Sequence, residues 1–221
     1  MGQQKKALVV FSGGQDSTTC LAWAKKEFSA VETITFDYGQ RHKIELESAK
    51  KITKIAKVSQ EVVKIDLFSK LTANALTDPS ITINQGSKDQ LPSTFVPGRN
   101  LIFLSIAAIY AKQRGIKDII TGVCQTDYSG YPDCRDQFIK SLEQTLNFSM
   151  DENFHLHTPL MFLSKKETVE MMQQLGQIEL LKHSHTCYNG TRPACGKCPA
   201  CKLRLKGFKE AGITDPLKYE Q

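Results

Sequence analysis

Short apolar runs alternate with amphipathic stretches along most of the chain. Residues 7–11 form a continuous apolar run, which is typical of a buried parallel strand. Similar runs predict strands over residues 31–36, 61–65, 118–123 and 155–158, and helical spacing predicts helices over residues 16–28, 44–58, 100–113, 134–148 and 165–175. This alternation predicts an α/β fold, in which an open parallel five-stranded sheet carries helices on both faces.

Two stretches depart from that rhythm. Residues 67–98 are rich in Thr, Ser, Asn and Pro, and a loop of that length is usually functional or poorly ordered. From His183 onward, cysteines, glycines and basic residues replace the alternating pattern. We therefore expect a main domain over residues 1–182 and a small C-terminal subdomain over residues 183–221 that packs on it.

Composition narrows the class of protein. Of 221 residues, 40% are hydrophobic and 24% are charged, which favours a globular chain over a disordered one. No run approaches the roughly 20 apolar residues of a membrane span, and the polar residues 1–6 lack the apolar core of a signal peptide. These features predict a cytoplasmic protein without membrane association, and the net charge of +6 weakly favours anionic partners.

Four of the seven cysteines gather near the C-terminus with the spacing C-x7-C-x2-C-x2-C. Structural zinc sites prefer four thiolates, and a closed set of four leaves no open position for catalysis. The spacing predicts one structural Zn²⁺ per subunit, bound by Cys187, Cys195, Cys198 and Cys201. An iron–sulfur cluster, redox disulfides, or His183 or His185 in place of one cysteine remain alternatives. We expect Cys20, Cys124 and Cys134 to be small buried residues, although a catalytic thiol at Cys124 or Cys134 is also possible.

A glycine turn follows the first predicted strand. Residues 12–17 read Ser-Gly-Gly-Gln-Asp-Ser and lead into a helix. Adjacent glycines let backbone N–H groups converge, and a helix N-terminus carries partial positive charge, so the turn is suited to bind phosphate. It matches neither the common nucleoside-triphosphatase loop nor the dinucleotide fingerprint. Asp16 would repel a phosphate unless it caps the helix or helps to hold a cation, and a plain tight turn is the alternative interpretation.

The turn resembles the Ser-Gly-Gly-x-Asp-Ser signature of the PP-loop ATP pyrophosphatases. Further segments resemble the 7-cyano-7-deazaguanine synthase family of queuosine biosynthesis over essentially the whole chain. These are residues 36–42 (FDYGQRH), 96–100 (VPGRN), 122–123, 127–135, 158–165 and the cysteine segment with its following glycines. The resemblance implies a PP-loop, Rossmann-like fold and an ATP-dependent carbon–nitrogen ligase. It implies that 7-carboxy-7-deazaguanine and ammonia become the nitrile through adenylated carboxylate and amide intermediates.

The resemblance also implies cofactors, partners and site residues. It implies ATP as co-substrate, Mg²⁺ as a further cofactor and a homodimer. It does not imply a nucleic acid partner. The implied ATP-binding residues are Phe11, Ser12, Gly13, Gly14, Gln15, Asp16, Ser17, Thr18, Thr19, Cys20, Leu21, Arg41 and His42. The implied catalytic residues are Asp16, Ser17, Arg99 and Lys165, and the implied substrate-binding residues are Asn100, Asp127, Tyr131 and Asp133.

The residue types allow these roles without requiring them. Arg41 and Arg99 can clamp phosphate or carboxylate through a planar fork of donors, or lie on the surface as solvated arginines. Lys165 can contact phosphate or simply begin a helix. Carboxylates such as Asp133 can accept hydrogen bonds from guanine-type N–H groups, or bond the backbone of their own turn. A histidine such as His42 is more often structural than catalytic.

Two other functions are compatible with the sequence. One is a PP-loop enzyme that modifies tRNA by thiolation, with Cys124 or Cys134 carrying sulfur. The positive charge of this sequence is scattered, however, and we expect 221 residues to leave no room for an appended RNA-binding domain. The other is a nucleotide-binding module without catalysis, in which the zinc-binding end serves as an interaction platform.

Overall fold

A parallel five-stranded sheet forms the centre of the molecule. The computed structural model describes residues 5–40, 43–78, 80–84, 91–126 and 130–220. The strands are β1 (Lys6–Val10), β2 (Ala30–Asp37), β3 (Ser59–Lys64), β4 (Asp118–Ile120) and β5 (His155–His157), in the order β3-β2-β1-β4-β5. Every neighbouring pair is parallel, which confirms the predicted fold class. In such sheets ligands bind at the carboxyl ends of the strands, where the strand order reverses, here between β1 and β4.

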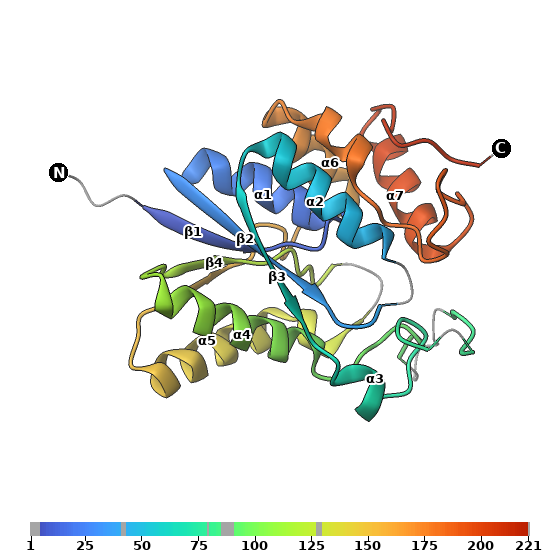
Figure 1. The fold of residues 1–221 in the computed structure, drawn as a ribbon. Helices are drawn as coiled ribbons and strands as arrows, with labels where there is room; N and C mark the ends of the chain where they lie inside the picture. The colour runs from blue at the N-terminus through green and yellow to red at the C-terminus, as the bar shows by residue number, and fades with distance from the viewer. Residues whose placement is uncertain (1–4, 41–42, 79, 85–90, 127–129, 221) are drawn as a thin grey trace.

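Helices cover both faces of the sheet (Figure 1). The α-helices are α1 (Gln15–Glu27), α2 (Ile44–Ala56), α3 (Phe68–Leu71), α4 (Arg99–Gln113), α5 (Asp136–Met150), α6 (Lys165–Gln174) and α7 (Pro199–Glu210), and two 3₁₀ turns are η1 (Pro132–Cys134) and η2 (Ile178–His183). In Figure 1, α1 and α2 lie on one side of the strands and α4 and α5 on the other. The short α3 lies within the long segment that we expected to be a loop.

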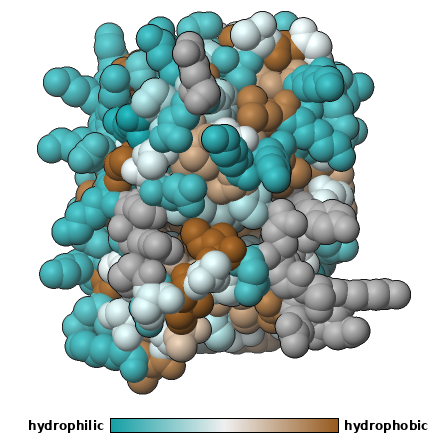
Figure 2. Space-filling model, turned by 90° about the vertical axis from the view of Figure 1, so that its right-hand side faces the viewer, coloured by the Kyte–Doolittle hydropathy of each residue, from teal (hydrophilic) through white to brown (hydrophobic). Residues whose placement is uncertain are grey.

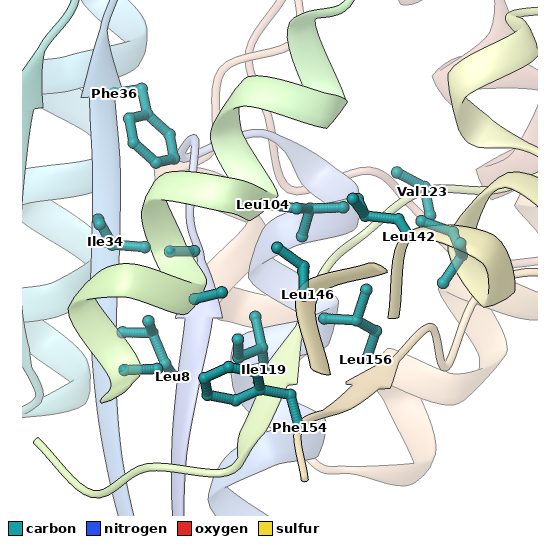
Figure 3. Close-up of a cluster of buried hydrophobic side chains, with 14 of the residues drawn as sticks. Leu8, Ile34, Phe36, Leu104, Ile119, Val123, Leu142, Leu146, Phe154 and Leu156 are labelled. Carbon is teal, nitrogen blue, oxygen red and sulfur yellow. The ribbon is translucent and has the colours of Figure 1, made fainter. Parts of the chain in front are cut away.

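The alternation of side chains along β1 builds one core on each face of the sheet. Leu8 points to the α4 and α5 side, where it joins Leu104 and Leu142 in the larger apolar cluster (Figure 3). Ala7 and Val9 point to the α1 and α2 side and belong to a second cluster. Successive side chains of a strand point to opposite faces, so a strand covered on both sides must be apolar at every position, as this run is.

The fourth strand is shorter than its apolar run predicted. We expected a strand over residues 118–123, and β4 ends at Ile120. The Thr121 N–H still donates to the His157 carbonyl at 3.0 Å, and the next residue passes close to the start of α1. A Cβ on Gly122 would lie 3.1 Å from the Asp16 carbonyl carbon and from the Ser17 nitrogen. The absence of a side chain at Gly122 therefore lets the end of β4 approach the glycine turn.

The C-terminal segment packs on the main sheet domain through α7, which contacts α6. Phe208 of α7 is buried in one apolar cluster with Val169 and Met172 of α6 and with Ala22 of α1. The four cysteines form a separate small cluster. The division into two parts at residue 182 stays a prediction, since residues on both sides of that position share a core. Within the described ranges, no helix is long and apolar enough to cross a bilayer.

Candidate functional site

The phosphate loop, residues 12–17, joins β1 to α1 and is held by hydrogen bonds of its own. The Ser12 N–H and Ser17 hydroxyl lie 3.3 Å apart, and the Thr18 hydroxyl donates to the Gly14 carbonyl at 2.7 Å. Gly13 has φ +84°, and a Cβ there would lie 2.6 Å from the Ala49 nitrogen and 2.8 Å from the Glu45 carbonyl oxygen. Glycine is therefore required at residue 13 for both conformation and space, and the loop rests directly on the first turn of α2.

Asp16 and Lys165 meet beside this loop. The Lys165 Nζ lies 2.7 Å from both carboxylate oxygens of Asp16. Lys165 is the first residue of α6, and Ser164 and Glu167 form a capping box that fixes the start of that helix. The Lys165 side chain is only 11% exposed. The carboxylate that seemed out of place in a phosphate-binding turn thus anchors a lysine there.

The loop and Lys165 line a cavity of about 340 Å³. Its other described lining residues include Arg99 and Asn100 at the start of α4, Tyr38 just after β2, Glu45 of α2, Cys124, and Thr186 and Tyr188 of the C-terminal segment. Figure 2 views the molecule from the side on which the strands end, and a hollow with hydrophobic atoms beside it lies near the middle of that face. A volume of this order suits a small-molecule ligand.

Charged groups line this cavity. Burial disfavours the charge of Arg99, but nearby groups that include Asp133 hold its pKa above its usual range, so the guanidinium stays charged. Burial raises the pKa of Glu45 to about 7, and the charge of Arg99 only partly offsets this. Burial also raises the pKa values of Tyr38 and Tyr131, which keeps both phenols neutral.

The residues expected to bind substrate divide into two groups. Asn100 and Tyr131 line the cavity, and the Tyr131 hydroxyl lies 2.6 Å from that of Thr94. Asp133 is buried behind the described lining and accepts a hydrogen bond from the Asn100 backbone N–H at 3.1 Å. The structure therefore shows Asp133 satisfying a free N–H in the first turn of α4, and its role in substrate binding stays a prediction. Asp127 lies outside the described residues.

The residues expected to bind ATP also divide. Phe11, Ser12, Gly14, Gln15, Asp16 and Ser17 line the cavity, whereas Gly13 is not part of the described lining. Thr18, Thr19, Cys20 and Leu21 lie one turn further along α1, and all four are fully buried. The structure does not bring these four side chains to the cavity; they pack the helix against the sheet. Arg41 and His42 lie outside the described residues.

Gln15 indicates that the cavity is built for a polar ligand. Its side chain lines the cavity and is 3% exposed, yet neither its amide nitrogen nor its amide oxygen has a hydrogen-bond partner among the described residues. A buried amide without partners costs free energy, so native proteins nearly always satisfy it. A ligand that offers both an acceptor and a donor would complete this site.

The four cysteines expected to bind metal come together as a buried cluster. The sulfur atoms of Cys187, Cys195, Cys198 and Cys201 all lie within 4.8 Å of one another. Four sulfurs bound to one zinc ion at about 2.3 Å would lie about 3.8 Å apart, so the residues present fit a tetrahedral metal ion such as Zn²⁺. Backbone N–H groups point at the sulfurs, as from Cys198 to Cys195 at 3.3 Å, and such bonds favour thiolates. His185 lies outside this set, with its Nε2 2.9 Å from the Cys187 carbonyl oxygen.

Backbone contacts tie the cysteine cluster to the phosphate loop. The His185 N–H donates to the Gly13 carbonyl at 2.9 Å, two residues before the first cysteine. Tyr188, one residue after that cysteine, lines the cavity. A metal ion in the cluster would hold this segment in place, and with it one wall of the cavity.

Arg204 forms a buried ion pair that the sequence did not indicate. Its Nε and one terminal nitrogen each lie 2.8 Å from an oxygen of Asp215, and the two side chains are 1% and 5% exposed. The Tyr219 hydroxyl also donates to Asp215, at 2.6 Å. This ion pair joins the residues after α7 to α7 itself.

Replacing Asp215 with Ala is expected to lower the free energy of unfolding by about 3–5 kcal/mol, because it leaves the buried guanidinium unpaired. Urea denaturation followed by circular dichroism measures the loss. The matched control is Glu210→Ala. It removes an exposed carboxylate of α7 that lies 3.7 Å from Lys206 of the same helix, so it should change stability little. A loss for Asp215→Ala no greater than that of the control would show that the buried pair does not stabilise the chain.

Comparisons with known proteins agree with this geometry. Residues 6–212 match the family model "Queuosine biosynthesis protein QueC". A "7-cyano-7-deazaguanine synthase" from Chromobacterium violaceum is 58% identical over 96% of this chain and 93% of the relative. One of the same name from Lysinibacillus sphaericus is 54% identical over 94% of this chain and 96% of the relative.

Among solved structures, a predicted tRNA methyltransferase subunit from Methanocaldococcus jannaschii superposes with a TM-score of 0.50. Its identity is 21%, and the match covers 76% of this chain and 74% of that one. This likeness concerns the fold alone. The family match spans nearly the whole chain and includes both the phosphate loop and the cysteine cluster, so the chain belongs to the QueC family of queuosine biosynthesis proteins.

Proposed function

We propose that this chain is an ATP-dependent ligase that converts 7-carboxy-7-deazaguanine and ammonia to 7-cyano-7-deazaguanine. The observation that carries the proposal is the shared cavity. The phosphate loop, the Asp16–Lys165 pair and the Arg99–Asn100 helix start all line one space of about 340 Å³, in a chain whose relatives bear the name of that synthase. The carboxylate of the acid attacks the α-phosphorus of ATP, and the bond between the α- and β-phosphates breaks.

The chain's own residues suit such a displacement. The N–H groups at the start of α1 and the Lys165 ammonium supply positive charge where charge develops on the phosphates. Arg99 also lines the cavity and stays charged, so it can pair with the acid's carboxylate or with phosphate. Tyr131 offers an aromatic face to a flat heterocycle. In the proposal Asn100 hydrogen-bonds that heterocycle.

The proposal includes the further groups that this reaction needs. Mg²⁺ would neutralise the departing pyrophosphate, Zn²⁺ would hold the cysteine cluster, and ammonia would be taken from solution in the cytoplasm. A homodimer is part of the proposal and is supported by Leu101 and Ile109, which lie exposed two turns apart on α4. No nucleic acid is involved.

Mass spectrometry of the reaction mixture tests the proposal. Purified protein is incubated with ATP, Mg²⁺, ammonium and 7-carboxy-7-deazaguanine, and each component is left out in turn. We expect the nitrile, AMP and pyrophosphate, and none of them when the acid is omitted. Formation of ADP in place of AMP, or no consumption of the acid by folded protein, would overturn the proposed reaction.

A further inference from the structure

The cavity holds a carboxylate that the proposed steps do not use. Among the described lining residues, two carry a carboxylate, Asp16 and Glu45. Asp16 is occupied, because Lys165 lies 2.7 Å from both of its oxygens. No described side chain hydrogen-bonds to Glu45 or lies within ion-pair distance of it. Glu45 is therefore the lining carboxylate left to act on a ligand.

The fold places Glu45 against the phosphate loop. Glu45 lies in the first turn of α2, and the close approach of its backbone to Gly13 fixes this turn beside the loop. Ser48, one turn further along α2, receives a hydrogen bond from Arg192 at 2.5 Å, so α2 is also held from the C-terminal side. These contacts hold the start of α2 in place. The Glu45 side chain lines the cavity, in which a bound nucleotide would be activated.

The groups around Glu45 leave it suited to a small cation. Among the described residues, Arg99 from α4 is the opposite charge that acts on it, and the phenols of Tyr38, just after β2, and of Tyr188 interact with its charge. Both phenols stay neutral because burial raises their pKa values. On α2 itself, Glu47 lies 4.0 Å from Arg192. Within the part of the chain that the structure describes, the carboxylate is thus half-buried near two neutral phenols and the guanidinium of Arg99.

We propose that Glu45 binds ammonium and is the base that releases ammonia for attack on the activated acid. This rests on the proposed function, whose acid must meet a nitrogen nucleophile. At neutral pH ammonia is almost entirely protonated, and ammonium has no lone pair with which to attack. A carboxylate in the cavity both attracts the cation and accepts its proton.

Glu45 takes one proton from ammonium, and the electron pair of that N–H bond becomes the lone pair of ammonia. This pair forms the carbon–nitrogen bond to the acyl adenylate, and the carbon–oxygen bond to AMP breaks with its electron pair leaving on AMP. The nitrogen then releases a second proton to solvent, and Glu45 returns its own proton to solvent before the next turnover. The pKa of Glu45, raised to about 7 by burial, matches a group that must gain and lose a proton near neutral pH.

The test separates adenylation from ammonia use. Exchange of labelled pyrophosphate into ATP, with the acid present and ammonium absent, reports adenylation alone. For E45Q we expect this exchange to stay within a few-fold of the unsubstituted enzyme, while kcat/KM for ammonium falls by about 10²–10⁴-fold. In the unsubstituted enzyme kcat/KM for ammonium should rise as pH rises through about 7 and then level off, since the ionised carboxylate is the base. E45Q depends on free ammonia instead, so its kcat/KM for ammonium should keep rising above pH 7 without levelling off.

Hydroxylamine provides the sharpest comparison, because it is neutral at pH 7 and needs no base to become a nucleophile. E45Q should form the hydroxamate at close to the unsubstituted rate, which also shows that the variant is folded. E47Q, on the same turn with an exposed side chain, is the matched control and should keep ammonium use. E45D should retain part of the ammonium use of the unsubstituted enzyme.

Equal losses of exchange, ammonium use and hydroxamate formation in E45Q would overturn the proposal and leave Glu45 as a counter-charge of Arg99. Unchanged ammonium use would overturn it too. Absence of acid-dependent exchange in the unsubstituted enzyme would instead contradict the proposed function itself, so the two failures are distinguishable.

Discussion

Replacing Lys165 with Met is expected to reduce acid-dependent AMP formation by about 10²–10³-fold, the usual effect of removing one preorganised group that stabilises developing charge. The methionine keeps the Cβ and the apolar stem that pack beside Gly207 of α7 and removes only the ammonium. Because Asp16 holds that ammonium at the phosphate loop, the loss should appear in kcat more than in the KM for ATP. Steady-state kinetics of AMP release measure both.

The adjacent residue supplies a matched control. Lys166 pairs with Glu170 at 3.5 Å and is half exposed, so Lys166→Met removes the same charge from the same helix but away from the cavity. It should leave the kinetics nearly unchanged. Asp16→Asn tests whether Asp16 must hold Lys165 in place, since this variant keeps the lysine but holds it weakly. If Lys165→Met and Lys166→Met behaved alike, the lysine at the loop would have no part in the chemistry.

Replacing Cys201 with Ser is expected to remove the metal and to unfold the C-terminal segment. Structural zinc sites of four thiolates contribute roughly 10–16 kcal/mol of apparent binding free energy in small domains, which exceeds the stability of most domains. Cys201 is 1% exposed and its sulfur lies 4.0 Å from that of Cys195. We expect a lower melting temperature and loss of one bound zinc per chain, measured by elemental mass spectrometry.

The loss of the metal should also weaken nucleotide binding. In the cysteine segment, His185 hydrogen-bonds to the phosphate loop and Tyr188 lines the cavity. Affinity for ATP should therefore fall along with the metal content. Cys134→Ser, which changes a half-buried thiol outside the cluster, should retain the zinc. Purified protein without bound metal, combined with an unchanged melting temperature of Cys201→Ser, would show that the cluster is not a metal site.

Local pattern was enough to predict the sheet and most of its helices. The run from Ala7 to Val9 is apolar at every position because helices cover both faces of β1, and that continuity is visible in the sequence. The start of α7 was not visible. Pro199 begins this helix directly after a cysteine, and the cysteines and lysines of the segment hide the helical spacing that Phe208 completes.

The parts of the site that adjoin in sequence were predictable, and those that meet only in space were not. Glycines and hydroxyls in residues 12–17 favour a phosphate-binding turn, and these residues adjoin in sequence; phosphate binding there stays a prediction. Glu45 looks like an ordinary acidic residue in the first turn of a helix, and only the folded structure shows that it lines the cavity. The pairing of Arg204 with Asp215 likewise depends on the fold of the chain end, for which periodicity offers no signal.

Transfer of an isotope from the acid to AMP would show which atom of ATP is attacked. In the proposed reaction an oxygen of the acid attacks the α-phosphorus of ATP at the phosphate loop. When 7-carboxy-7-deazaguanine labelled with ¹⁸O in its carboxylate is converted in ordinary water, we expect ¹⁸O in the phosphate of AMP and none in pyrophosphate. Label in inorganic phosphate, or AMP free of label while the nitrile forms, would contradict the proposed reaction.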